Sequence, residues 1–74
     1  MTKPGIYKHS KTGNLYRVHF TAHNSENSDE VFVVYESLYE NPVSKFRIRP
    51  AKMFEETVEI DGKKLPRFKF IKES

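Results

Sequence analysis

The chain of 74 residues contains no cysteine and no tryptophan, and it has only three glycines. Without cysteine, neither a disulfide framework nor a thiolate metal site can stabilise so short a domain, so stability must come from apolar burial. The glycines, at positions 5, 13 and 62, cannot form a GxGxxG loop, and the sequence has no P-loop. Both common nucleotide-binding signatures are therefore excluded.

Long apolar segments are also missing. The longest apolar run, Val31 to Tyr35, has five residues, whereas a membrane span needs about 20. The first five residues, Met-Thr-Lys-Pro-Gly, show no apolar signal-peptide segment. Together with the absence of cysteine, this predicts a cytoplasmic protein that does not bind a membrane.

Aromatic residues and positive charge are what the chain does have. Six Phe and four Tyr can support a small core, because each buried ring removes about 150–250 Å² from water. The formal net charge is +3, and residues 44–74 carry nine Lys or Arg against five acidic residues. This distribution indicates either a surface that faces an anion or an ordinary solvated surface.

Alternating polarity and regular turn chemistry divide the chain into short strands. Apolar and polar side chains alternate from residue 15 to 23, as in a half-buried strand, whereas residues 30–36 are almost continuously apolar, which indicates cover on both faces. Asp61-Gly62 is a type I′ hairpin signal, and Pro50 suits the start of a helical turn. The expected strands are Gly5–His9, Leu15–His23, Glu30–Glu36, Ser44–Arg49, Thr57–Ile60 and Lys64–Ile71, with loops at 24–29 and Ser37–Pro42.

The same alternation assigns side chains to faces. The apolar face is predicted to carry Tyr16, Val18, Phe20, Ala22, Phe46, Ile48, Phe68 and Phe70. The opposite, solvent-facing side is predicted to carry Arg17, Lys45, Arg47, Arg49, Arg67 and Lys69.

These elements predict one mostly β domain over residues 1–74, with an ordered core of about residues 4–71. It should contain five to six antiparallel strands and one short helical or 3-10 turn near Pro50–Phe54. An SH3-like barrel is the expected architecture, because closure removes exposed sheet edges, and a β-roll is the alternative.

Metal and catalytic sites are not indicated. His19 and His23 share a strand face but lie about 13 Å apart, too far to bind one ion, and His9 is distant in the sequence. No GxSxG elbow occurs, and Glu55-Glu56 follow a turn where carboxylates are solvated. We therefore expect no metal, no cofactor and no enzyme, although His9 or Glu55 would be the residues for an enzyme to use.

The basic and aromatic residues are the best candidates for function. Arg and Lys bind phosphates and carboxylates, and exposed rings stack on bases or present flat contact area. The predicted function is a binding module for a peptide or protein partner, with a single-stranded nucleic-acid binding domain as the alternative. A small-anion-binding protein, an enzyme and a purely structural role rank lower, and the oligomeric state is open. The candidate binding residues are Tyr7, His9, Arg17, Tyr35, Tyr39, Arg47 and Arg49.

Four groups of motifs extend from Gly5 to Ile71. They are Gly5-Ile6-Tyr7-Lys8-His9 with Lys11 and Gly13-Asn14-Leu15-Tyr16-Arg17-Val18, then Val33-Val34-Tyr35-Glu36-Ser37-Leu38-Tyr39, then Ile48-Arg49-Pro50 with Met53-Phe54-Glu55-Glu56, and Asp61-Gly62 followed by Pro66-Arg67-Phe68. In combination they resemble a bacterial family, domain-of-unknown-function family 1653. The resemblance implies a free-standing small bacterial or phage-type protein, and it supplies no catalytic residue, cofactor or partner.

The resemblance also directs attention to particular positions, namely Tyr7, His9, Tyr35, Tyr39 and Arg49. This chain has Arg47 where the family tends to carry an aromatic residue, and it has extra residues around Asn41–Lys45. A groove built on that aromatic residue is therefore expected to be altered here.

Overall fold

The computed structural model describes residues 2–40 and 45–73, which form seven strands and one short helix. The prediction of a mostly β domain is confirmed. Asn41, Pro42 and Ser44, which belong to an expected loop and an expected strand start, lie outside the described residues. The elements are β1 (Gly5–His9), β2 (Leu15–Asn24), β3 (Asn27–Ser37), β4 (Phe46–Pro50), α1 (Ala51–Phe54), β5 (Thr57–Ile60), β6 (Lys63–Pro66) and β7 (Phe68–Lys72).

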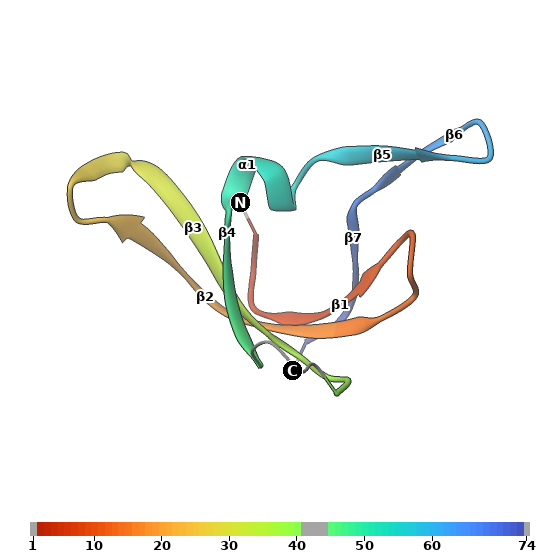
Figure 1. The fold of residues 1–74 in the computed structure, drawn as a ribbon, viewed down its shortest axis with the longest axis horizontal. Helices are drawn as coiled ribbons and strands as arrows, with labels where there is room; N and C mark the ends of the chain where they lie inside the picture. Colours follow the sequence, from red (N-terminus) through yellow and green to blue (C-terminus); the bar gives the residue numbers. More distant parts are fainter. Residues whose placement is uncertain (1, 41–44, 74) are drawn as a thin grey trace.

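The strands form two antiparallel sheets. A five-stranded sheet has the order β4-β3-β2-β1-β7, and β5 and β6 form a separate hairpin. Figure 1 shows that the larger sheet curves strongly, so that its edge strands β4 and β7 stand apart while α1 and β5 cross between them. These edge strands are not paired with each other in the described part of the chain. The expected SH3-like barrel is therefore not confirmed, and seven strands replace the expected five to six.

The additional strand arises because the segment expected as one strand, Lys64–Ile71, divides at Arg67. The backbone N–H of Arg67 donates to the carbonyl of Glu56 at 2.8 Å, and its carbonyl accepts from the N–H of Ser10 at 2.9 Å. The residues before Arg67 pair with β5, whereas those after it pair with β1. Arg67 is thus held by backbone contacts between the two sheets.

The core fills the inside of the curve, which we call the inner face of the sheet. Phe54 of α1 stacks on Phe68 of β7 with ring centroids 4.1 Å apart, and Tyr7 meets Phe54 edge-on at 5.4 Å. Val18 and Val33 are 1% and 0% exposed. The short helix therefore covers the concave side of the sheet with the ring of Phe54. Burial of these aromatic rings is the main stabilising contribution.

Four residues assigned to the apolar face from the sequence, Phe20, Ala22, Phe46 and Ile48, lie on the outer face instead. Phe20 is 56% exposed because the register shifts between Val18 and Phe20, and such a bulge turns the following side chains to the other face. Phe46 and Ile48 are 58% and 63% exposed, so they also lie on the outer face.

The predicted turn at Asp61-Gly62 is confirmed. Both residues have positive φ, 53° and 77°, as a type I′ turn requires, and Ile60 pairs with Lys63 across it. Gly5 has a different constraint, because a Cβ there would lie 2.6 Å from the Phe70 ring and 2.7 Å from the Lys72 carbonyl oxygen. Glycine at this position allows β1 and β7 to approach closely. No helix in residues 2–40 and 45–73 is long and apolar enough to cross a membrane.

Candidate functional site

The arginines of β4 lie on the inner face of the sheet. Arg47 pairs with Tyr35 across the sheet, and Arg49 pairs with Val33, which is fully buried on the inner face. Directly paired residues on adjacent strands point to the same side. The expectation that Arg47 and Arg49 face outward, opposite the core, is therefore wrong, because they point toward the core side.

Arg49 is held by two aromatic residues. Its Nε donates to the Tyr35 hydroxyl at 3.4 Å, and its guanidinium carbon lies 5.8 Å from the centroid of the Phe68 ring. A cation–π contact and a long hydrogen bond orient a planar guanidinium without neutralising it. In the described part of the chain, no carboxylate lies within ion-pair distance of Arg49.

Arg67 lies at the junction of β6 and β7, where its charge acts on His9. Its terminal nitrogen forms an ion pair with Glu56 at 2.9 Å. Its Nε is buried and has no hydrogen-bond partner within the described ranges. A buried N–H without an acceptor is rare and costs free energy, so this donor is suited to an acceptor that a ligand provides.

His9 lies beside these arginines, and we call the group of Arg47, Arg49, Arg67 and His9 the inner arginine cluster. Its ring meets Phe68 edge-on at 4.9 Å. Burial lowers the pKa of His9, and the positive charges of Arg67, Arg49 and Lys11 lower it further. The backbone N–H groups of Lys11 and Thr12 lie 3.2 and 3.4 Å from its Nδ1, so the neutral ring carries its proton on Nε2.

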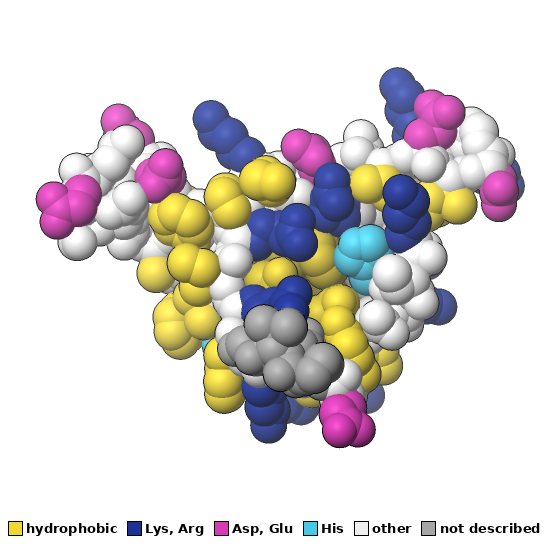
Figure 2. All heavy atoms as spheres, viewed as in Figure 1, with side chains coloured by type: hydrophobic (Ala, Val, Ile, Leu, Met, Phe, Trp, Pro, Cys, Tyr) yellow, Lys and Arg dark blue, Asp and Glu magenta, His cyan; other side chains and the backbone are white. Residues whose placement is uncertain are grey.

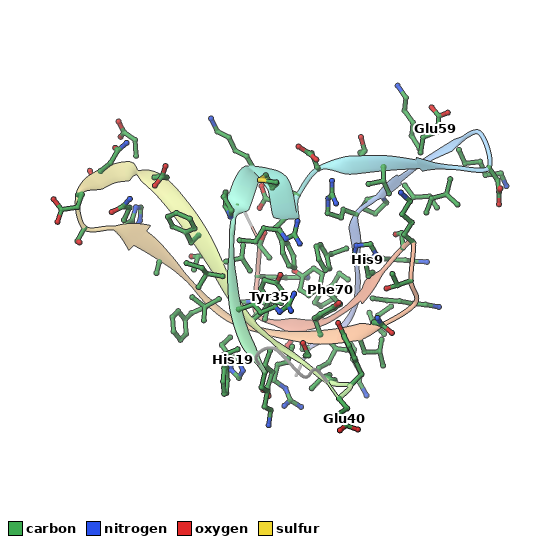
Figure 3. The ribbon with its side chains drawn as sticks, in the orientation of Figure 1. His9, His19, Tyr35, Glu40, Glu59 and Phe70 are labelled. Carbon is green, nitrogen blue, oxygen red and sulfur yellow. The ribbon has the colours of Figure 1, made fainter. Side chains whose placement is uncertain are left out.

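Figure 2 shows Lys and Arg side chains gathered near the middle of this face, next to a histidine and among hydrophobic side chains. In Figure 3, Tyr35 and Phe70 point into the curve of the sheet, His9 lies beside β7, and His19 lies on the outer side. The inner arginine cluster therefore places positive charge next to aromatic side chains of the core.

The tyrosines selected from the sequence have different environments. Tyr7 and Tyr35 are 7% and 2% exposed, so their rings belong to the core; only the Tyr35 hydroxyl reaches Arg49. Tyr39 is 37% exposed, and its hydroxyl lies 3.0 Å from that of Tyr16. Burial, followed by this hydrogen bond, raises the pKa of Tyr16 to about 12. Tyr39 is thus the one of these three that offers a ring to a ligand.

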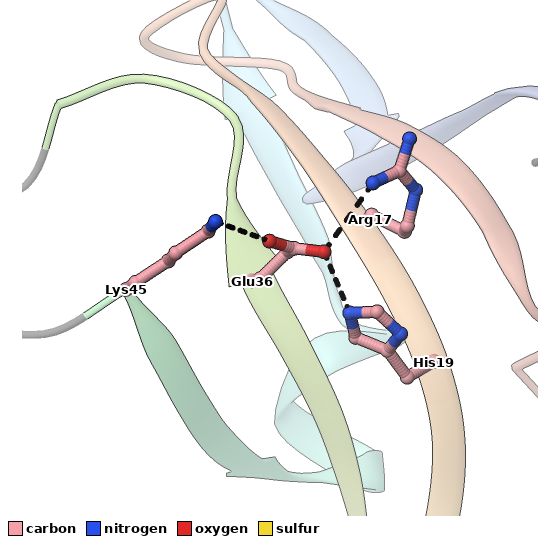
Figure 4. Close-up of polar contacts among 4 residues, drawn as sticks. All are labelled: Arg17, His19, Glu36 and Lys45. Atoms are coloured by element: carbon pink, nitrogen blue, oxygen red, sulfur yellow. Dashed lines mark hydrogen bonds and ion pairs between the residues drawn. The ribbon is translucent and has the colours of Figure 1, made fainter.

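The expected basic surface divides between the two faces. Arg17, also a candidate, lies with Lys45 on the outer face, where both contact Glu36 (Figure 4). Lys69 lies on the outer side of β7, because its neighbour Phe68 points inward. Arg49 and Arg67 both lie close enough to His9 to lower its pKa, and Arg47 shares the inner face of β4 with Arg49, whereas Arg17, Lys45 and Lys69 are not part of that group.

Glu36 is a feature that the sequence analysis missed. Its side chain is 7% exposed and is surrounded by Arg17 at 3.3 Å, His19 at 2.8 Å and Lys45 at 3.4 Å. Desolvation works to raise the pKa of Glu36, but the hydrogen bonds from His19, Lys45 and Arg17 hold it below the ordinary value. Its position at the end of an apolar strand carried no sign of three cationic partners.

The three histidines lie in three different surroundings. His9 belongs to the inner arginine cluster, His19 contacts Glu36, and the Nδ1 of His23 lies 2.8 Å from the carbonyl oxygen of Ser28. The described residues contain no group of three His, Cys, Asp or Glu side chains arranged to hold a metal ion.

Neither of two open hollows on the described surface is lined by a residue of the cluster. One, of about 570 Å³, lies between the β2–β3 hairpin and α1 and includes Val31, Ala51 and Lys52. The other, of about 520 Å³, is bordered by Arg17, Glu36 and Tyr39. We base the candidate site on the inner arginine cluster, because the Arg67 Nε has no acceptor and Arg49 no carboxylate partner among the described residues, whereas the charges around Glu36 compensate one another.

Comparison with known proteins supports the family suggested by the motifs. The family model described as a protein of unknown function (DUF1653) matches residues 5–70. The crystal structure of a DUF1653 protein from Bordetella bronchiseptica superimposes with a TM-score of 0.87 at 33% identity, covering 99% of this chain and 91% of that one. No curated protein matches the chain. With nearly its whole length matched in both comparisons, the chain belongs to the DUF1653 family.

Proposed function

We propose that this protein is a binding module for a peptide or protein partner, and that the inner arginine cluster binds an acidic group of that partner. The observation that carries the proposal is Arg49, whose guanidinium is fixed by Tyr35 and Phe68 while no described carboxylate neutralises it. A planar, pre-positioned guanidinium suits the two oxygens of a carboxylate. The buried Nε of Arg67 adds a donor without an acceptor, and the neutral Nε2–H of His9 can add another.

The burial of the rings favours a peptide over single-stranded nucleic acid. Binding of single strands relies on exposed rings that stack on successive bases. Tyr7 and Tyr35 are buried in the core, which leaves Tyr39 as the exposed ring of the three. The exposed rings of Phe20 and Phe46 lie on the outer face, away from the cluster, so the cluster has no row of rings on which successive bases could stack.

The proposed compartment remains the cytosol, on sequence grounds. Small secreted domains of this length depend on disulfides, and this sequence has no cysteine.

A peptide array tests the proposed function. Peptides rich in Asp and Glu are printed beside copies in which each acid is replaced by its amide, and the array is probed with the protein and with Arg49→Gln. Lys52→Gln is the matched control, since it removes an exposed positive charge on α1 outside the cluster. We expect binding to acidic peptides that Arg49→Gln weakens by about tenfold, or ~1.4 kcal/mol, and that Lys52→Gln leaves nearly unchanged.

Two outcomes would contradict this function. Equal loss in both variants would mean that binding depends on net charge and not on the cluster. Tight retention of single-stranded oligonucleotides, with an affinity that falls steeply as salt increases, would favour the nucleic-acid alternative.

A further inference from the structure

The outer face of the sheet carries apolar side chains that the fold leaves uncovered. Cross-strand pairing places Phe20, Val34 and Ile48 in one row and Ala22, Phe32 and Pro50 in the next. Phe46 lies beside Ile48 on β4 with one residue between them. We call this set the outer strip: Phe20, Ala22, Phe32, Val34, Phe46 and Ile48. It lies on the opposite side of β2, β3 and β4 from the inner arginine cluster.

The strip exposes a substantial apolar area. Phe20, Phe46 and Ile48 are 56%, 58% and 63% exposed, which amounts to on the order of 300 Å² for three side chains of this size. The largest apolar patch on a typical monomer covers about 300–600 Å² and is often functional. A stable interface buries about 800 Å² on each partner, so the strip would be its apolar centre and would need a polar border.

The charges at the two ends of the strip have opposite signs. Glu26 lies in the turn between β2 and β3, Asp29 and Glu30 lie near the start of β3, and residues 18–44 contain no Lys or Arg. At the other end, Lys8 pairs with Lys69 on the outer side of β1 and β7, whereas Arg17 and Lys45 are largely balanced by Glu36. Figure 2 shows acidic side chains at the tip of the hairpin, hydrophobic ones along its flank, and Lys and Arg side chains below them.

We propose that the outer strip is the contact surface for a second copy of this chain. In a two-fold contact, each patch meets its own copy, so an acidic end and a basic end on the same patch face each other if the two hairpins run antiparallel. This arrangement covers the exposed rings and pairs the acidic turn of each copy with the basic end of the other. Face-to-face packing is favoured over addition of strands at β4, because that edge strand has only five residues and ends at Pro50.

Sedimentation velocity over about 1 to 500 µM tests the apolar contact, a range that covers weak association through an interface of this size. We expect a reversible monomer–dimer equilibrium for the full chain. The double variant Phe20→Thr/Ile48→Thr keeps residues that favour strands and should raise the dimer dissociation constant at least tenfold. Leu65→Thr is the matched control, because Leu65 is 38% exposed on β6 and lies outside the strip.

Folding of each variant is checked by thermal melting at about 1 µM, where the chain is monomeric, so that a loss of dimer is not mistaken for unfolding. A monomer throughout the concentration range would overturn the proposal. Equal weakening by Leu65→Thr would overturn it as well, since association would then not depend on this face.

A double-mutant cycle tests the antiparallel arrangement. Glu30→Gln removes one negative charge and keeps the oxygen that accepts from Asn24 at 2.7 Å, whereas Lys69→Gln removes one positive charge from the far end. Each variant should weaken the dimer several-fold, and the two together should weaken it by less than the product of the single effects, because the charges interact between copies. Purely multiplicative effects would contradict the antiparallel arrangement.

Discussion

The two faces of the β2–β3–β4 sheet have opposite relations between polarity and burial. On the inner face, Arg47 and Arg49 lie beside a core of buried rings, and Arg49 rests over Phe68. On the outer face, Phe46 and Ile48 are exposed, while the carboxylate of Glu36 is almost fully buried. The side chains available to partners therefore differ between the faces. They are polar on the inner face and apolar on the outer face.

The largest expected effect separates a ring on the inner face from one on the outer face. Phe54→Ala should lower the free energy of unfolding by about 3–5 kcal/mol, because Phe54 is 2% exposed and stacks on Phe68. Phe20→Ala should cost less than about 1 kcal/mol, since that ring is already more than half exposed. Urea denaturation at about 1 µM protein measures both, and similar costs would contradict the assignment of faces.

Two adjacent valines offer a sharper form of the same comparison. Val33→Thr places a hydroxyl in the fully buried inner position and should cost about 1–3 kcal/mol of unfolding free energy. Val34→Thr makes the same chemical change one residue later, on the outer face, and should change stability by less than about 0.5 kcal/mol. If Val34→Thr proved the more damaging in urea denaturation, the register of β3 would have to be reversed.

Acid should weaken the outer face through Glu36. The folded pKa of Glu36 lies below its ordinary value, so the folded chain takes up this proton at lower pH than the unfolded chain does. The stabilisation is therefore complete above the unfolded pKa of about 4.3 and is lost as the pH falls through the lower folded value. Between pH 6 and pH 3, thermal melting should show a smaller loss of Tm for Glu36→Gln than for the original chain, and parallel curves would contradict this account.

The smallest effect is on the ionisation of His9 at the inner face. Burial is the main cause of the lowered pKa of His9, and Arg67 and then Arg49 add to it. Arg49→Gln should therefore raise the pKa of His9 part of the way toward its ordinary value, whereas Lys52→Gln should leave it unchanged. NMR titration of the His9 ring measures this shift. A His9 pKa that does not respond to Arg49→Gln would place Arg49 further from the ring than the inner arginine cluster requires.

The candidate site could be predicted only in part from the sequence. Arg49 and Arg47, chosen from the sequence for an outward position, lie on the inner face with His9, whereas Tyr39 lies against Tyr16 and outside the cluster. Tyr35 was selected for an exposed ring, and instead its hydroxyl holds Arg49 from within the core. Arg67 belongs to the candidate site because two backbone hydrogen bonds hold it between the sheets. Contacts between residues so far apart in the chain cannot be predicted from local sequence patterns.

The sequence by itself determined the strand-rich composition of the chain, the two-residue alternation, the Asp61-Gly62 turn and the position of the helical turn, because these depend on local backbone preferences. Only the tertiary structure decided which face of each strand is inside. An alternation of two defines two faces but not the one that distant segments cover, and here Phe54 of α1 and Phe68 of β7 cover the face that carries Arg47 and Arg49. The bulge after Val18 then reverses the faces within β2, since one unpaired residue turns every later side chain to the other side.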